Sequence, residues 1–245
     1  MRAFVLLLLL GGCAGERVPT AVPIRPEAVP ERTRFKAVLV AGDDAQAVFD
    51  NGVARMAERL AVAGVQARRL AASDRAIAAG AAPATLSNVL AEIGAMDARR
   101  GEGCFVFITS HGLQRRGLVL ARAKEVLSPA ALDRALEQGC GPAPTVVVAS
   151  GCYSGAFAAA PMARPNRIVL TAARPDRPSF GCGADFTYTY FDECFFDSLE
   201  ISPNWQAAYF QTRDCVGRRE ATLKERPSDP QGYFGTAVAS LPLPW

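Results

Sequence analysis

Short apolar runs rich in β-branched or aromatic residues alternate along the chain with longer stretches whose apolar residues recur at helical spacing. The runs predict buried strands, and the longer stretches predict helices. The predicted strands cover residues 35–41, 65–70, 104–110, 145–151, 166–172 and 231–238. The predicted helices cover residues 46–63, 85–98, 128–137, 154–160, 185–199 and 204–223. This alternation favours an α/β protein in which helices cover both faces of a mostly parallel sheet.

Two of the strand-like runs end in small residues that are followed by side chains able to carry chemistry. His111, the only histidine, lies just past the run 104–110, and Cys152 lies just past the run 145–151. Catalytic groups of open α/β sheets gather outside the carboxyl ends of the strands. A thiol and the only imidazole at equivalent strand ends indicate a nucleophile and its base. Cys152 alone would indicate only a buried structural cysteine, because buried free cysteines are common.

Length and charge narrow the class of protein. The 245 residues can form one α/β domain with short extensions, and 50% of them are hydrophobic, as a packed core requires. The net charge of +3 is small and is carried by scattered arginines, without a basic stripe or an RNA-binding signature. We therefore do not expect nucleic acid as a partner.

The N-terminus has the pattern of an export signal. Met1-Arg2 gives a positive start, and the apolar run at residues 3–10 is shorter than the roughly 20 residues that span a bilayer. The tetrapeptide that ends in Cys13 (Leu-Gly-Gly-Cys) resembles a bacterial lipobox, in which the cysteine is acylated after cleavage. The alternative is an ordinary signal peptide with a chance cysteine. Ala14 in place of Asp after Cys13 favours, by resemblance to the usual sorting pattern, the outer membrane facing the periplasm.

The chain is thus expected to divide into three parts, of which the first two connect it to the membrane. A signal peptide at residues 1–12 would be removed, and residues 13–34, which contain several prolines, would form a lipid-anchored tether. One folded domain would follow at residues 35–245. The expected contact with the membrane is therefore a lipid on Cys13, at the surface of the cell envelope.

Seven cysteines are present, and two of them are assigned, Cys13 to lipid and Cys152 to catalysis. An exported protein can form disulfides. Cys104 and Cys140 precede the strands that carry the two candidate catalytic residues, so we expect them to pair if these strands are parallel neighbours roughly 4.8 Å apart. Metal binding is the rival use, but the chain has no Cys-x-x-Cys pair and its only histidine is assigned. Neither a metal nor a cofactor is therefore expected.

Taken together, the two strand-end motifs resemble the legumain family of cysteine peptidases, in the caspase-like clan. In that family one strand ends in His-Gly, and the next ends in a small residue followed by the catalytic cysteine. The corresponding segments here are Ser110-His111-Gly112 and Gly151-Cys152-Tyr153-Ser154-Gly155. Residues 38–42, 171–182 and 189–191 also resemble family segments. The resemblance implies a caspase-like three-layer sandwich with a mostly parallel, six-stranded sheet and helices on both faces.

The reaction that these residues predict is hydrolysis of a peptide bond through a thioester on Cys152. Only the thiolate attacks a carbonyl, and a helix beginning at Ser154 would favour that thiolate over a thiol of pKa ~8.5. His111 would pass the proton to the leaving amine, and the backbone N–H groups of Gly112 and Cys152 would hold the oxyanion. Asp44, in the turn after the first strand, is the candidate for orienting the imidazole, although an Asp in such a turn often serves only the turn.

The resemblance also indicates which residues form the pocket for the side chain before the scissile bond. The clan builds this pocket from the turn after the first strand, the residue after the nucleophile and the loop after the fifth strand. The candidate substrate-binding residues here are Asp50, Asn51, Tyr153, Ser179, Phe180 and Glu193. Asp50 and Glu193 would make the pocket acidic, and buried charge requires a partner. We therefore expect a basic residue before the scissile bond, with Asn as the runner-up by family likeness.

The first functional expectation is an envelope-anchored cysteine endopeptidase that acts on polypeptides. Two alternatives stay open at this point. One is a non-catalytic lipoprotein that uses a caspase-like fold as a binding module. The other is a transpeptidase that passes the acyl group from the same pair of residues to an amine.

Overall fold

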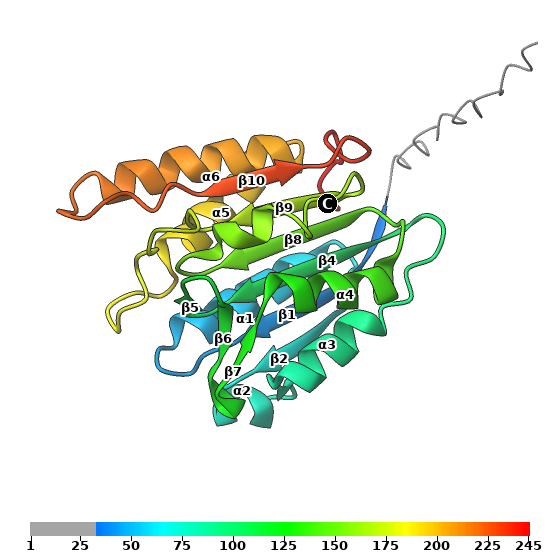
Figure 1. The fold of residues 1–245 in the computed structure, drawn as a ribbon, viewed down its shortest axis with the longest axis horizontal. Coiled ribbons are helices and arrows are strands. Elements are labelled where there is room, and N and C mark those ends of the chain that lie inside the picture. The colour runs from blue at the N-terminus through cyan, green and yellow to red at the C-terminus, as the bar shows by residue number, and fades with distance from the viewer. Residues whose placement is uncertain (1–32) are drawn as a thin grey trace, which may run out of the picture.

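The computed structural model describes residues 33–245, which fold around a seven-stranded sheet with the order β10-β9-β8-β4-β1-β2-β3 (Figure 1). Every neighbouring pair is parallel except β9 with β10. The strands are β1 (Arg34–Ala41), β2 (Ala67–Ala71), β3 (Ala82–Pro83), β4 (Glu102–Thr109), β8 (Thr145–Ser150), β9 (Arg167–Thr171) and β10 (Gln231–Phe234). The sheet is mostly parallel, as predicted, and has one strand more than expected because the short β3 extends its edge beyond β2.

The signal peptide, the lipidation of Cys13 and the tether up to residue 32 lie outside the described residues. Strand β1 begins at Arg34, one residue before the expected start of the folded domain. No helix between residues 33 and 245 is long and apolar enough to cross a membrane.

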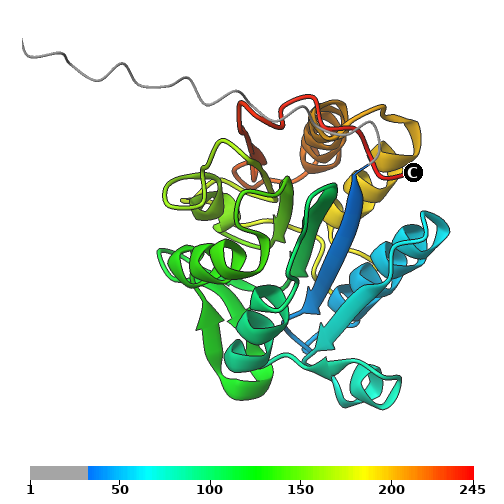
Figure 2. The same ribbon diagram turned by 90° about the vertical axis from the view of Figure 1, so that its right-hand side faces the viewer.

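Helices cover both faces of the sheet (Figures 1 and 2). The α-helices are α1 (Val48–Val62), α2 (Asp74–Ala78), α3 (Leu86–Gly94), α4 (Pro129–Cys140), α5 (Tyr190–Ile201) and α6 (Trp205–Glu220). Two 3₁₀-helices are η1 (Ala121–Ala123) and η2 (Ser154–Ala158). Helices α1, α5 and α6 pack on one face, and α3 and α4 pack on the other. This arrangement is the expected three-layer sandwich.

Strand β1 shows why the central strands are apolar at almost every position. Ala37 and Leu39 belong to the core under α1, α5 and α6, whereas Val38 and Val40 belong to the core under α3 and α4. Successive side chains of a strand point to opposite faces, and both faces are buried here. A continuous apolar run is therefore what this position in the sheet requires.

Polar side chains fix where several helices begin. Thr85, Ser128 and Asn204 each precede a helix and accept a hydrogen bond from the backbone N–H three residues further on. Pro129 follows Ser128 at the first position of α4, where the missing N–H has no cost. These caps satisfy backbone N–H groups in the first turns of α3, α4 and α6.

A small antiparallel sheet follows β4 and forms a hairpin. It consists of β5 (Gly112–Leu113), β6 (Gly117–Leu120) and β7 (Glu125–Leu127). Leu118, Leu120 and Leu127 are fully buried in the core under α3 and α4. The hairpin is thereby anchored to the sheet beside the end of β4.

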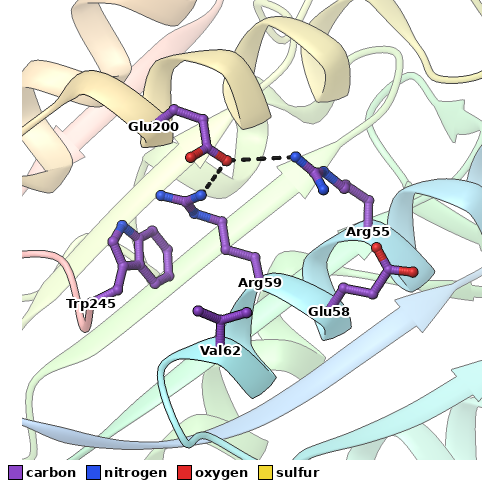
Figure 3. A pocket seen from close by; sticks show the side chains of 6 residues that line it. All are labelled: Arg55, Glu58, Arg59, Val62, Glu200 and Trp245. Atoms are coloured by element: carbon purple, nitrogen blue, oxygen red, sulfur yellow. Dashed lines mark hydrogen bonds and ion pairs between the residues drawn. The ribbon is translucent and has the colours of Figure 1, made fainter.

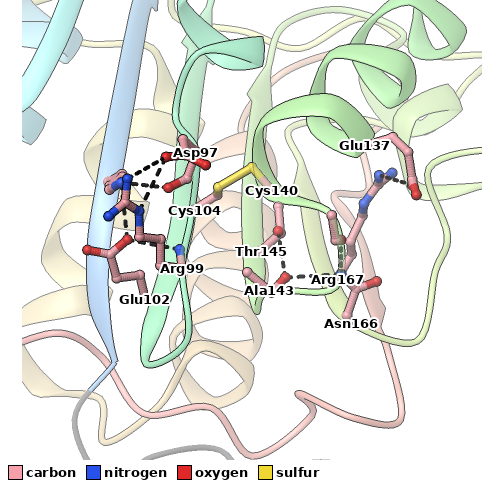
Figure 4. Close-up of a disulfide and its surroundings, with 12 residues drawn as sticks. Asp97, Arg99, Glu102, Cys104, Glu137, Cys140, Ala143, Thr145, Asn166 and Arg167 are labelled. Carbon is pink, nitrogen blue, oxygen red and sulfur yellow. Dashed lines mark hydrogen bonds and ion pairs between the residues drawn. A yellow bond between two sulfur atoms is a disulfide. The ribbon is translucent and has the colours of Figure 1, made fainter.

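Two disulfides hold helices in place. The expected bond between Cys104 and Cys140 is confirmed, and it joins β4 to the last residue of α4 (Figure 4). A second disulfide joins Cys194 of α5 to Cys215 of α6. The sequence left this second pairing open, because spacing alone does not show which faces of the two helices meet. Both bonds form within the folded domain, and Cys152 stays a free thiol.

Candidate active site

The two segments that carry His111 and Cys152 run side by side beyond the sheet. Strands β4 and β8 are parallel neighbours, and their last paired residues are Thr109 and Ser150. The Ser110 N–H then donates a hydrogen bond to the Ser150 carbonyl at 3.0 Å. Each candidate catalytic residue follows its last paired residue by two positions, so the structure brings them to equivalent strand ends.

Glycines allow these two segments to touch. A Cβ atom on Gly151 would lie 2.5 Å from the Ser110 carbonyl oxygen, and one on Gly112 would lie 1.8 Å from the Cys152 carbonyl oxygen. Real Cβ atoms do not approach backbone oxygens so closely, so both positions require glycine. The peptide after His111 therefore lies directly against the peptide of Cys152.

The loop after β9 surrounds the Cys152 sulfur. The Ser179 N–H points at Sγ from 3.3 Å, the Ser179 hydroxyl lies 3.7 Å from it, and the thiol donates to the Ser179 carbonyl at 3.6 Å. Tyr153 has a left-handed backbone with φ of 59°, and its N–H donates to the Arg177 carbonyl at 2.8 Å. Of the predicted substrate-binding residues, Tyr153 and Ser179 thus lie beside the nucleophile.

Helix η2 fixes the turn that follows Cys152. It is a five-residue 3₁₀-helix, shorter than the predicted helix at residues 154–160. Its Phe157 is fully buried, and the Ser154 hydroxyl accepts a hydrogen bond from the Ala173 N–H at 3.3 Å. So short a helix adds less dipole to the thiolate than the prediction assumed. The donors that lie at the sulfur are the Ser179 N–H and hydroxyl.

His111 is half-buried and packs edge-on against Phe49 of α1, with ring centroids 5.1 Å apart. Its carbonyl accepts a hydrogen bond from the Val119 N–H of the hairpin at 2.8 Å. Within residues 33–245, no hydrogen bond joins the imidazole to Cys152. The ring is therefore held by packing and by its own backbone, which leaves its nitrogens without a bond to the thiol.

Asp44 does not orient His111 in this structure. The turn after β1 buries Asp43, whose carboxylate accepts the Ala45 N–H at 2.8 Å, and leaves Asp44 exposed. In the part of the chain that the structure describes, no hydrogen bond joins Asp44 to His111. The residues Gly-Asp-Asp thus serve the turn, and the contact that positions the imidazole comes from Phe49.

The two acidic residues of the expected substrate pocket already have partners in the chain. Asp50 accepts a hydrogen bond from the Ser73 hydroxyl at 2.6 Å and forms an ion pair with Arg75. Glu193 forms an ion pair with Arg219. The expectation of a basic substrate rested on uncompensated carboxylates, and this premise is wrong because each charge is balanced within the fold.

The remaining pocket candidates hold the loop between β9 and α5. The Asn51 side-chain amide donates to the Thr187 carbonyl at 3.0 Å, and the Phe180 carbonyl accepts the Tyr190 N–H at 3.1 Å. Both contacts connect this loop to helices that lie on the same face of the sheet as Phe49. Asn51 and Phe180 therefore shape the loop that carries Ser179.

Two residues near the dyad were not predicted. Cys182 is a half-buried free thiol, and burial raises its pKa, as does the nearby charge of Cys152. Asp192 of α5 is completely buried, accepts a hydrogen bond from the Thr109 hydroxyl at 2.7 Å, and has its pKa raised by burial to about 6. The signal that could have found Asp192 is an acidic residue among the phenylalanines of α5.

A cavity of about 540 Å³ lies away from these residues, between α1 and the end of α5 (Figure 3). In it Glu200 forms ion pairs with Arg55 and Arg59, and the Arg59 guanidinium lies 4.2 Å from the ring centre of Trp245. None of its lining residues belongs to the candidate site. No group of three potential metal ligands occurs among residues 33–245.

Comparisons with known proteins agree with this geometry. The model of the peptidase C13 family matches residues 85–211, just over half of the chain, including His111 and Cys152. No curated protein sequence matches the chain. The structure of caspase-1 from Spodoptera frugiperda is similar with a TM-score of 0.61 and 12% identity, over 89% of this chain and 93% of that one, and it confirms the caspase-like fold. The chain belongs to the peptidase C13 family, as the resemblance to legumain predicted.

Proposed function

We propose that the protein is a cysteine endopeptidase in which Cys152 is the nucleophile and His111 is the acid-base group. Membership of the peptidase C13 family supports a cysteine peptidase. The observation that carries the assignment to these residues is the contact between their segments, in which Gly112 lies against the Cys152 peptide. A free thiol and the only imidazole of the chain thereby share one edge of the sheet.

The reaction begins when the Cys152 thiolate attacks the carbonyl carbon of the scissile bond. The carbonyl electron pair moves onto oxygen and then returns, the C–N bond breaks, and the imidazolium of His111 protonates the leaving amine. A water molecule then loses a proton to His111 and attacks the thioester, the C–S bond breaks, and the acid is released with the Cys152 thiolate and the His111 imidazolium restored. Within residues 33–245 no hydrogen bond joins His111 to Cys152. This agrees with the two roles proposed here, in which Cys152 attacks the carbonyl carbon and His111 protonates the leaving amine.

Two backbone N–H groups are proposed to hold the oxyanion, those of Gly112 and Cys152. The support is their proximity, because a Cβ on Gly112 would lie 3.2 Å from the Cys152 nitrogen. The Tyr153 N–H is excluded from this role because it donates to the Arg177 carbonyl. Fixed backbone donors of this kind stabilise the charge of the tetrahedral intermediate.

We further propose that Cys13 carries lipid and holds the domain at the cell envelope, facing the periplasm. The lipobox-like sequence supports the lipid. The topology suits an anchor, since the chain enters the sheet at the amino end of β1, whereas the dyad follows the carboxyl ends of β4 and β8. Cys13→Ser should release the protein from membranes, and a mature N-terminus without lipid would refute the proposal.

The peptidase proposal is tested with a peptide library and two matched cysteine variants. Cys152→Ala should abolish cleavage, whereas Cys182→Ala, which removes the other free thiol, should retain it. His111→Ala should also abolish cleavage while the protein stays folded. An added amine that is incorporated into the product would indicate a transpeptidase, and cleavage by Cys152→Ala at the wild-type rate would refute the assignment.

A further inference from the structure

A completely buried carboxylate, that of Asp192, lies beneath the strand ends that carry the dyad. Thr109 and Ser150 form the last pair of β4 and β8, and His111 and Cys152 each follow two residues later. The Thr109 hydroxyl donates a hydrogen bond to Asp192 Oδ2 at 2.7 Å. The carboxylate is thus connected to the strand end that leads to His111.

The second oxygen of Asp192 accepts no hydrogen bond among residues 33–245. Asp192 Oδ1 and the Ser150 hydroxyl oxygen are both buried, and neither has a hydrogen-bond partner at bonding distance among the described residues. The Ser150 hydroxyl is among the groups that lower the pKa of Asp192, against the desolvation that raises it. Among residues 33–245, the side chain that donates a hydrogen bond to this carboxylate is therefore Thr109 of β4.

The surroundings of Asp192 are polar but uncharged. Thr189, the N-cap of α5, accepts the Asp192 N–H at 3.0 Å, and a Cβ on Gly52 of α1 would lie 3.2 Å from Oδ2. The groups that face it from β4 and α1 are thus a hydroxyl and a glycine. The next residue on α5, Glu193, is partly exposed and pairs with Arg219. No ion pair with a cation, among residues 33–245, accounts for this carboxylate.

Burial without a cation has a cost. Desolvation raises the pKa of Asp192 to about 6, against the hydrogen bonds of its hydroxyl neighbours, which lower it. At neutral pH the folded protein therefore holds an ionised carboxylate that burial disfavours. Strongly perturbed groups of this kind are common at functional sites. The buried charge of Asp192 does not stabilise the fold. A role for this carboxylate is therefore sought in its position beneath His111 and Cys152.

We propose that Asp192 is a positioning residue, whose carboxylate accepts a hydrogen bond from Thr109 and so fixes the end of β4 that places His111 beside Cys152. The inference rests on the proposed function, because it takes these two residues as the catalytic pair. Because His111 follows Thr109 by two residues, the carboxylate acts on the position of the imidazole through the end of β4. A charge-assisted hydrogen bond to a carboxylate also restricts geometry more than a neutral pair does.

The proposed role has a definite pH dependence. The ionised carboxylate accepts the Thr109 hydroxyl proton at Oδ2, whereas the protonated acid carries a proton of its own on one of its oxygens. The spacing of the dyad is therefore held best above the pKa of Asp192 and is loosened below it. An Asn at this position has one acceptor oxygen and one donor group at every pH, so it reproduces the loosened arrangement.

The test compares variants that preserve shape. Asp192→Asn and Thr109→Val each remove one part of the hydrogen bond, and Thr109→Ser restores the hydroxyl. Asp197→Asn is the matched control, since Asp197 lies on the same helix but is exposed. The measurements are kcat and KM for peptide cleavage from pH 5 to 8, and the proton NMR signal of His111, which is unambiguous because it is the only histidine.

We expect Asp192→Asn to lower kcat about tenfold or more, as loss of a hydrogen bond to a charged group implies, with KM changed less than about threefold. The pH dependence of kcat near pH 6 should disappear, and the His111 signal should shift. Thr109→Val should act in the same direction, Thr109→Ser should recover activity, and Asp197→Asn should behave as wild type. The losses from Asp192→Asn and Thr109→Val should not add in the double variant.

Three results would overturn the inference. One is a kcat within twofold of wild type in Asp192→Asn with an unchanged His111 signal. Another is a loss confined to KM, which would mean that the carboxylate contacts substrate. The third is additive losses from Asp192→Asn and Thr109→Val, which would mean that they act separately.

Failure of the proposed function itself would be recognised independently. If the wild-type protein cleaves no peptide, the peptidase proposal fails, but alkylation of Cys152 by iodoacetamide and the His111 signal still report on the two strand ends. Shifts in both readouts with Asp192→Asn and Thr109→Val, but not with Asp197→Asn, would support the positioning role. Unchanged readouts would refute it.

Discussion

Gly112 lies so close to Cys152 that a Cβ atom on it would be 1.8 Å from the Cys152 carbonyl oxygen. The residue after the imidazole and the nucleophile are therefore in backbone contact, and nothing larger than hydrogen fits between them. Because the obstacle is backbone and not a flexible side chain, a substitution can be accommodated only if the two strand ends separate.

Gly112→Ala should consequently reduce peptide cleavage at least about a hundredfold, since misplacement of catalytic groups by about 1 Å has effects of this size. Gly217→Ala is the control, because a Cβ on this exposed glycine of α6 meets nothing within 4 Å and should be neutral or slightly stabilising. Cleavage assays and thermal unfolding of both variants check the prediction. Normal turnover in Gly112→Ala would show that the contact is not needed.

The two free thiols should differ in reactivity. Burial and the nearby charge of Cys152 raise the pKa of Cys182, so little of Cys182 is thiolate at pH 7.5. Iodoacetamide should therefore modify Cys152 well before Cys182, as followed by mass spectrometry of the two peptides over time. Cys152→Ala should accelerate modification of Cys182, because it removes the neighbouring negative charge. Equal rates in the wild-type protein would contradict this assignment.

Stability should depend on pH through Asp192. Its pKa is about 6 in the folded protein and ordinarily 3.8, so ionisation is disfavoured by folding. The penalty is absent below about pH 4, grows as pH rises through 6, and reaches about 3 kcal/mol. The free energy of unfolding of Asp192→Asn, relative to wild type, should therefore rise by about this amount between pH 4 and 7.5. Asp197→Asn should show no such trend, and a flat difference for Asp192→Asn would contradict the shifted pKa.

The sequence predicts the fold well because the central strands are buried on both faces. Such strands leave continuous apolar runs, which mark β4 and β8 and hence the strand ends where His111 and Cys152 lie. Short edge elements leave weaker signals, and for this reason α2 and the two-residue β3 are absent from the predicted elements. The register between β4 and β8 then brings the two candidate catalytic residues together. The hydrophobic pattern predicts the two strands but does not fix this register.

The parts of the site that depend on tertiary contacts were not predictable. Asp44 and Asp43 are adjacent in one turn, and only the fold decides that Asp43 is buried and Asp44 exposed. The Arg219 partner of Glu193 comes from the next helix, at a distance along the chain that no local pattern reveals. Asp192 was missed for the same reason, since its hydrogen-bond partner, the Thr109 hydroxyl, lies on a distant strand.

The ion pair of Glu193 also decides how the substrate preference should respond to mutation. Arg219 binds the Glu193 carboxylate, and its guanidinium lies 4.9 Å from the ring centre of Tyr190. The positive charge of Arg219 balances the negative charge of Glu193. The carboxylate therefore attracts a basic side chain of a substrate only weakly. Partly exposed pairs of this kind contribute only about 0.2–1 kcal/mol to stability, so removing the charge should leave the fold intact.

Glu193→Gln should therefore change the turnover of Arg and Asn substrates by the same factor, within about twofold, since 0.4 kcal/mol corresponds to a factor of two. Paired peptides that differ only before the scissile bond give this ratio directly. Arg219→Gln is the complementary variant, because it leaves Glu193 uncompensated, and turnover of the Arg peptide should then rise relative to the Asn peptide if the side chain faces substrate. A selective loss of Arg cleavage in Glu193→Gln would instead show that substrate displaces Arg219, and the acidic pocket would be restored.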